Sequence, residues 1–176
     1  MLELELIDAL AIELDELFDG YLLPNKAGTL QQVAVFKQFV PTATGLTAGS
    51  GAGLNGYTDS DYESNFPCIV VKYVEHTDYE ERRLDQSLTN IKLIYGVYDA
   101  AVECQGYRDI LNMIDMTRLR FLNDRIVAQK FMLDMPVKTR LLEADTWPVY
   151  YGEMDLKFIT GRPVMGRDHF TRRAVV

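Results

Sequence analysis

A strand that leads directly into a helix, within residues 88–124, constrains this chain more than any other stretch. Over residues 88–98, apolar side chains alternate with other side chains, which is the period of a strand with one buried face. Over residues 106–124, the apolar spacing predicts an amphipathic helix. The apolar strand positions are Ile91, Leu93, Tyr95 and Val97, and the helical stripe is Tyr107, Ile110, Leu111, Ile114, Arg118, Phe121 and Leu122. Because each element has one apolar face, the two must pack on each other or on shared neighbours.

Residues 3–18 predict a second amphipathic helix. Its apolar stripe consists of Ile7, Leu10, Leu14, Leu17 and Phe18. Its other side is acidic and includes no basic residue; the acidic positions are Glu3, Glu5, Asp8, Glu13, Asp15 and Glu16. Such a face is either solvated or turned toward a cationic partner or the acidic lumen of an assembly, and the sequence leaves both interpretations open.

Three further segments have strand character, at residues 31–40, 67–75 and 152–159. The segments at 67–75 and 88–98 are expected to pair as antiparallel neighbours. Two amphipathic helices need an apolar sheet face, and the alternating strands supply one. We therefore expect an α+β fold, with a mostly antiparallel sheet of about four strands that carries both helices on one face.

Three other segments are predicted to lie outside the packed sheet. Residues 126–142 contain two strand-like runs on either side of Asp134-Met135-Pro136, which predicts a projecting β-hairpin. Residues 42–65 are rich in Gly, match no phosphate-binding glycine pattern and predict a flexible loop, interpreted as a mobile arm that orders against a partner subunit. Residues 161–176 are predicted to be a basic C-terminal tail. The length of the chain suggests one domain, which we expect to span residues 1–160.

The composition of the chain excludes several functional classes. Its 176 residues carry a net charge of −8, which argues against a general nucleic-acid binder because phosphate binding needs clustered Lys and Arg. Cys68 and Cys104 are not at metal-ligand spacing, and we expect free thiols in a reducing cytosol. No apolar run approaches the ~20 residues of a membrane helix, and the acidic N-terminus does not resemble a signal peptide.

No stretch of the sequence has the pattern of a catalytic, cofactor or metal site. His76 and His169 lie far apart, without the neighbours that a catalytic triad needs, and both are expected to be exposed to solvent. Acidic pairs such as Asp59 and Asp61 lack the ligand order of a calcium-binding loop. We therefore predict no catalytic, cofactor-binding or metal-binding residues, and we expect that the chain is not an enzyme.

An aromatic stretch at residues 145–152 contains the only Trp of the chain. Pro148 restricts its backbone, and Tyr150 and Tyr151 follow. One interpretation is a rigid loop whose rings cover the core, and the other is a contact surface for another subunit, since Trp, Tyr and Arg dominate binding hot spots. We expect a mixed role, with the Trp147 ring mostly in the core and the two tyrosines at the contact. The predicted interface residues are Trp147, Tyr150, Tyr151, Arg162, Arg167, Arg172 and Arg173.

The order of these pieces over residues 1–160 resembles the tail terminator, or tail completion, proteins in the neck of tailed bacteriophages. The resemblance is carried by the acidic N-terminal helix and by the segments CIVVKYVEHTD, IKLIYGVYDAAVECQGYRDILNMIDMTRLRFL and DTWPVYYGEMDLKFI. It implies an α+β structural virion protein that forms a ring, expected to be a hexamer, which caps the tail tube and stops its growth. The alternative is another neck protein, a head-closure or adaptor subunit of the head–tail connector.

The resemblance also implies the partners of the chain. These are further copies of itself, the tail tube protein and a connector protein on the head side. DNA would pass through the lumen of the ring without specific binding, and no membrane or cofactor is expected. The implied location is the tail or neck of the virion, after assembly in the host cytoplasm.

Overall fold

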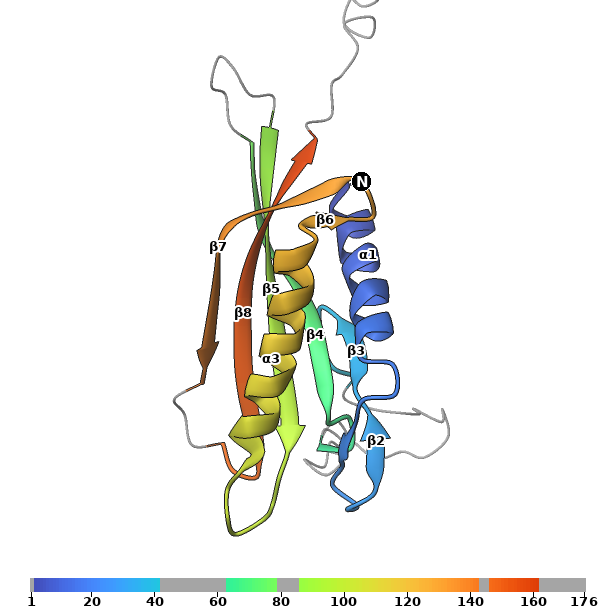
Figure 1. Cartoon of the computed structure of the whole chain (residues 1–176), viewed down its shortest axis with the longest axis vertical. Helices are drawn as coiled ribbons and strands as arrows, with labels where there is room; N and C mark the ends of the chain where they lie inside the picture. Colours follow the sequence, from blue (N-terminus) through green and yellow to red (C-terminus); the bar gives the residue numbers. More distant parts are fainter. Residues whose placement is uncertain (1, 42–62, 79–85, 143–145, 162–176) are drawn as a thin grey trace, which may run out of the picture.

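The computed structural model describes residues 2–41, 63–78, 86–142 and 146–161. Within these ranges, two helices pack on a six-stranded sheet, and a separate two-stranded sheet lies beside them (Figure 1). This confirms the expected α+β class. The helices and strands are α1 (Leu2–Leu17), β1 (Leu22–Pro24), β2 (Leu30–Gln32), β3 (Ala34–Lys37), β4 (Cys68–Asp78), β5 (Gln86–Tyr98), α3 (Gly106–Asn123), β6 (Ile126–Val127), β7 (Phe131–Leu141) and β8 (Val149–Gly161).

The six-stranded sheet has the order β3-β4-β5-β8-β7-β6. The pairing of β3 with β4 is parallel and the others are antiparallel, as expected for a mostly antiparallel sheet. The predicted pairing of the segments at 67–75 and 88–98 is confirmed by β4 and β5. In the middle of the sheet, Leu93 lies between Val71 of β4 and Met154 of β8. The three longest ladders therefore form a rigid centre on which the rest of the chain packs.

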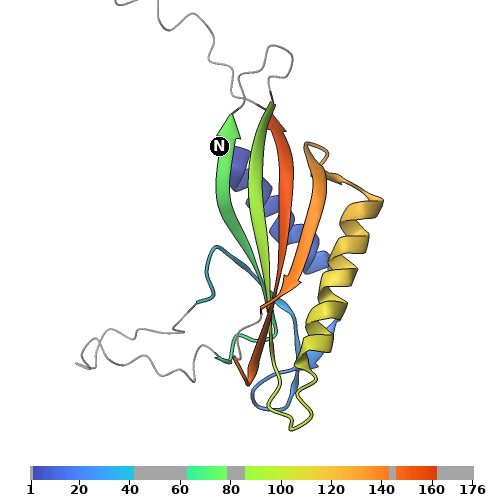
Figure 2. The same ribbon diagram turned by 90° about the vertical axis from the view of Figure 1, so that its left-hand side faces the viewer.

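The main core lies between one face of this curled sheet and both helices (Figure 2). Helix α1 contacts β3 and β4, whereas α3 contacts β5 and β8. The alternation in the sequence predicts the buried sheet face correctly; Ile91, Leu93, Tyr95, Val97, Met154, Leu156 and Phe158 are all buried there. The alternating apolar residues of these two strands thus decide which face of each strand is buried.

The apolar stripe predicted for the helix at residues 106–124, which is α3, is only partly correct. Ile110, Ile114 and Phe121 are buried, but Tyr107, Leu111 and Arg118 are exposed. The buried positions between them are Met113 and Thr117. Thr117 can be buried because its hydroxyl donates a hydrogen bond to the carbonyl oxygen of Met113, at 2.9 Å. The helix is therefore rotated relative to the predicted stripe.

The prediction of four strands is wrong, as is the projecting hairpin at 126–142. The turn lies between β6 and β7, where Ala128 and Gln129 adopt positive φ, and β7 continues through Pro136 to pair with β8. The register shifts between Asp134 and Lys138, so the ladder accommodates a residue that has no N–H. A proline that looks like a turn in the sequence is here a bulge in a strand near the sheet edge.

The predicted strand at 31–40 is divided in two. Strand β2 pairs with β1 in the separate small sheet, and β3 joins the main sheet after the buried Val33. The predicted flexible loop at 42–65 and the basic tail at 161–176 fall almost entirely outside the described residues.

Two glutamates, each close to an arginine, differ in the direction of their pKa. Glu13 of α1 forms an ion pair with Arg120 of α3, in which Nη2 of Arg120 lies 3.1 Å from Oε2 of Glu13. Burial nevertheless raises the pKa of Glu13 more than Arg120 lowers it. Burial also acts to raise the pKa of Glu153, but hydrogen bonds from Lys92 and Arg140 outweigh it and the pKa lies below its usual range. Of these two glutamates, the fold thus favours the charged form of Glu153 and the neutral form of Glu13.

Replacing Glu153 with Gln should lower the free energy of unfolding near neutral pH by about 1 kcal/mol, since the Arg140 partner is half exposed and screened. A carboxyl with a lowered native pKa contributes stability above its unfolded pKa, and that contribution is lost as the pH falls through the native pKa. The difference between wild type and Glu153→Gln should therefore vanish in acid.

Glu13→Gln is the matched control. Because the native pKa of Glu13 is raised, the favourable contribution exists only in acid and is lost as the pH rises through that pKa. The substitution should not destabilise the protein near neutral pH. Urea unfolding at neutral and acidic pH measures both variants, and equal destabilisation by the two substitutions near neutral pH would contradict the assigned pKa directions.

Candidate subunit interface

The aromatic stretch lies at the end of the sheet where β5 ends, α3 begins and β8 begins (Figure 1). Backbone hydrogen bonds hold its turn on both sides. The N–H of Val149 donates to the carbonyl oxygen of Thr146 at 3.0 Å, and the N–H of Asp99 donates to that of Pro148 at 2.8 Å. The N–H of Leu142 donates to the carbonyl oxygen of Tyr151 at 3.1 Å. The segment is therefore a fixed part of the sheet end.

The two tyrosines point to opposite faces of β8, as consecutive strand residues must. Tyr150 packs against the main core and over Gly106, where an added Cβ would lie 2.4 Å from its Cδ2 atom. Tyr151 packs on the other face against Phe66, with ring centroids 5.8 Å apart in an edge-to-face arrangement. Both rings are half-buried, so they fix the loop to two cores at once.

The expectation that the Trp147 ring lies mostly in the core is wrong. Trp147 is 57% exposed, whereas Tyr150 and Tyr151 are half-buried and pack against the core residues on the two faces of β8. The reason is that Tyr150 and Tyr151 belong to β8 and inherit its two faces, whereas Trp147 belongs to the turn before it. The predicted Trp147, Tyr150 and Tyr151 do lie together at one end of the fold. The other predicted interface residues, Arg162, Arg167, Arg172 and Arg173, lie outside the described part of the chain.

Other apolar side chains surround Trp147. We call this surface the aromatic end, and it consists of Val102, Tyr107, Leu142, Trp147 and Tyr150. Val102 is 98% exposed, and Tyr107 and Leu142 are also exposed. Two open hollows of about 240 and 600 Å³ border it, and Trp147 and Tyr150 line both. The surface is apolar, hollowed and held by a rigid frame, which suits contact with another protein more than it suits chemistry.

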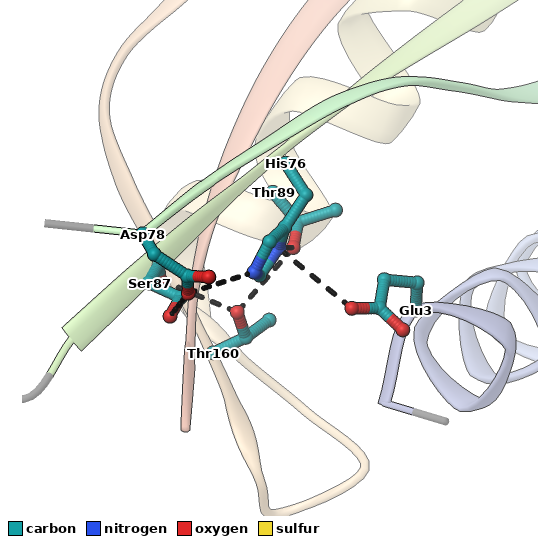
Figure 3. A network of polar contacts seen from close by, with 6 residues as sticks. All are labelled: Glu3, His76, Asp78, Ser87, Thr89 and Thr160. Atoms are coloured by element: carbon teal, nitrogen blue, oxygen red, sulfur yellow. Dashed lines mark hydrogen bonds and ion pairs between the residues drawn. The ribbon is translucent and has the colours of Figure 1, made fainter. Parts of the chain in front are cut away.

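A polar network occupies the opposite end of the sheet (Figure 3). His76 Nδ1 lies 2.8 Å from Thr89 Oγ1, and His76 Nε2 lies 3.2 Å from Asp78 Oδ1. Glu3 of α1 approaches His76 Nδ1 at 3.9 Å. The expectation of an exposed His76 is wrong, since its side chain is only 17% exposed; His169 lies outside the described ranges.

This network has the order of a hydroxyl, an imidazole and a carboxylate, but its geometry favours a structural role. The hydroxyl belongs to Thr89, which is fully buried and also lies 3.3 Å from Thr160 Oγ1. A nucleophile must reach its substrate, and this one has no exposed surface. The network instead ties β4, β5 and β8 to the first turn of α1.

Sequence reasoning did not single out the charged outer face of the sheet, which faces away from the helices. Lys92 Nζ lies 3.1 Å from Glu153 Oε2, and Arg140 Nη1 lies 2.9 Å from Asp155 Oδ2. Lys138 and Lys157 belong to the same face. The sequence shows the alternating charged residues of the final strand, β8, but it does not show that β7 pairs beside it.

The described residues also bear on metal binding and on membrane insertion. No group of three or more His, Cys, Asp or Glu side chains among them is arranged to hold a metal ion. Neither described helix combines the length and apolar character needed to cross a membrane. Comparison with protein families and with curated proteins gives no match to this chain.

Proposed function

We propose that this chain is a structural virion protein of the tail terminator type. It forms a ring that caps the tail tube, stops its growth and joins the tail to the head-side connector. The proposal is supported by the resemblance of residues 1–160 to that family and by a surface suited to protein contact. The observation that carries it is the aromatic end, where a rigid turn holds Trp147 57% exposed among other apolar side chains.

An exposed tryptophan on a fixed turn has the properties of a binding anchor. Large aromatic rings contribute most of the contact energy in many interfaces, and they contribute more when little freedom is lost on binding. Here the backbone is held by β5 and β8, and Tyr150 and Tyr151 are already packed. We therefore place the aromatic end at or beside a contact between neighbouring subunits of the ring.

In this proposal the ring has two flat faces and a lumen. One face binds the last ring of the tail tube and the other binds the head-side connector, and DNA passes through the lumen without specific contacts. The same resemblance suggests assembly in the host cytoplasm.

Light scattering on the size-fractionated chain should give a mass about six times the 20.1 kDa of one subunit. Purified tail tube protein should then form tubes of limited length when the ring is present, and longer tubes when it is absent. A chain that remains monomeric and assembles only on a head connector would support the adaptor alternative instead. Tubes whose length is unchanged by the ring would contradict the terminator activity.

A further inference from the structure

We infer that neighbouring copies in the ring associate through unlike faces, with the acidic outer side of α1 from one copy lying in a basic groove on the sheet of the next. This inference rests on the proposed ring. It names a second contact, separate from the aromatic end, and it follows from the charges and apolar side chains on two opposite faces of the fold.

The groove lies on the outer face of the sheet and has a volume of about 340 Å³. Its apolar part includes Val74, which is exposed, and Pro136 of the β7 bulge. Its charged lining consists of Lys92, Lys138, Arg140, Asp155 and Lys157. We call this surface the outer groove.

Only some of the basic side chains in the outer groove form ion pairs with described residues of the same subunit. Lys92 and Arg140 form ion pairs with Glu153 and Asp155. Lys138 and Lys157 form no ion pair among the described residues, and both are exposed. The groove therefore offers two ammonium groups that have no ion-pair partner among the described residues, together with the apolar side chains Val74 and Pro136 on its two sides.

The outer side of α1 has the complementary arrangement. Ile12 is 59% exposed, and the acidic residues Asp8, Asp15 and Glu16 lie on the same side of the helix, one turn before and after it. Asp8 pairs with Lys37 at 2.6 Å. Asp15 and Glu16 are exposed and form no ion pair within the described part of the chain. The outer side of α1 thus offers an apolar side chain and carboxylates, and the outer groove offers apolar side chains and ammonium groups.

The positions of the two surfaces allow each copy to bind a neighbour on either side. Helix α1 covers the inner face of the sheet (Figures 1 and 2). The charged residues that line the outer groove belong to the opposite face. Because the contact joins unlike faces, every pair of copies keeps one free face of each kind and can add further copies. The assembly is a closed ring when the rotation from copy to copy closes, as the proposed ring requires, and an open filament when it does not. Opposite charges across such a contact steer association and fix its register.

Two charge-reversal variants test this contact. The first carries Lys138→Glu and Lys157→Glu, and the second carries Asp15→Lys and Glu16→Lys. Each alone should weaken ring assembly at least about tenfold, because both faces then have the same sign. Mixing the two variants in equal amounts should restore the ring, since the reversed helix of one copy fits the reversed groove of the other in alternation.

The control reverses an exposed charge pair elsewhere. Arg118 and Asp115 lie 3.8 Å apart on the exposed side of α3, and Arg118→Glu with Asp115→Lys should leave assembly unchanged. Circular dichroism confirms that each variant folds, and light scattering measures the mass.

The outcomes separate the inference from the proposed function. If wild type forms a ring and each variant alone forms it equally well, the inference is overturned and the proposed function stays in place. Variants that fail alone and also fail when mixed overturn it as well. Open or non-hexameric assemblies that dissolve in each variant and return in the mixture support the contact and contradict the closed terminator ring. A monomeric wild type overturns both.

Discussion

A single methyl group added at Gly152 should lower the free energy of unfolding by about 3 kcal/mol. Gly152 lies on the inner face of β8, where α3 crosses the sheet. A Cβ there would lie 2.4 Å from Cγ2 of Ile110 and 2.9 Å from Cδ1 of Ile114. Neither the helix nor the central strand can move without disturbing the main core, so Gly152→Ala should force them apart. The midpoint and slope of urea unfolding measure the loss.

Two further variants identify the cause. Gly28→Ala is the matched control, because Gly28 has φ +74° and nothing within 4 Å of an added Cβ, so only backbone strain of about 1 kcal/mol is expected. Adding Gly152→Ala to Ile110→Ala should cost less than adding it to wild type, because the closer of the two clashing methyl groups is gone and only that of Ile114 remains. A Gly152→Ala protein as stable as wild type would show that α3 does not press on β8.

Trp147→Ala should dissociate the ring while the subunit stays folded. The side chain is 57% exposed, so its removal takes little from the core, whereas an interface anchor of this type contributes about 2 kcal/mol or more per contact. Light scattering over a dilution series measures the ring, and circular dichroism measures the fold.

Leu30→Ala is the control for this substitution. Leu30 is 66% exposed and belongs to β2 of the small sheet, and it lines neither hollow of the aromatic end. Its removal should leave the ring intact. A ring that survives Trp147→Ala as well as Leu30→Ala would remove the aromatic end from the subunit contact, and a large loss of folding stability would restore the core role that the sequence suggested.

The parts of the fold that could be predicted are those in which a side chain's own sequence neighbours decide its environment. Apolar residues occupy every second position of β5 from Ile91 to Val97 and of β8 from Met154 to Phe158, so their buried face was correctly assigned. Helix α3 was harder, because Tyr107 and Leu111 are apolar yet exposed, while Thr117 is polar yet buried. The hydrogen bond that satisfies Thr117 forms only once the helix exists.

The position of His76 could not be predicted because it depends on a bulge. The register of β4 shifts between Tyr73 and Glu75, which moves every later side chain to the other face. His76 therefore lies opposite Thr89 on the inner side. Without this shift it would belong to the outer face with Lys72.

The candidate interface was predicted in its composition but not in its arrangement. A Trp and two Tyr in one short stretch are visible in the sequence, but which ring enters the core depends on where β8 begins. Predicting the outer groove would also require the pairing of β7 with β8, because Lys138 and Lys157 become neighbours only through that pairing. Surfaces built from several strands require the strand order, and the sequence did not reveal it.

The bulge of β7 also protects the subunit against aggregation. From Asp134 onward, β7 pairs only with β8 among the described residues, so its other backbone edge is open to a further strand. Pro136 has no N–H to donate, the register shift interrupts the regular strand, and the exposed Lys138 adds a charge that a second sheet would have to bury. Subunits that meet at high concentration are thus discouraged from joining their sheets into fibres, which leaves side-chain surfaces as the means of recognition.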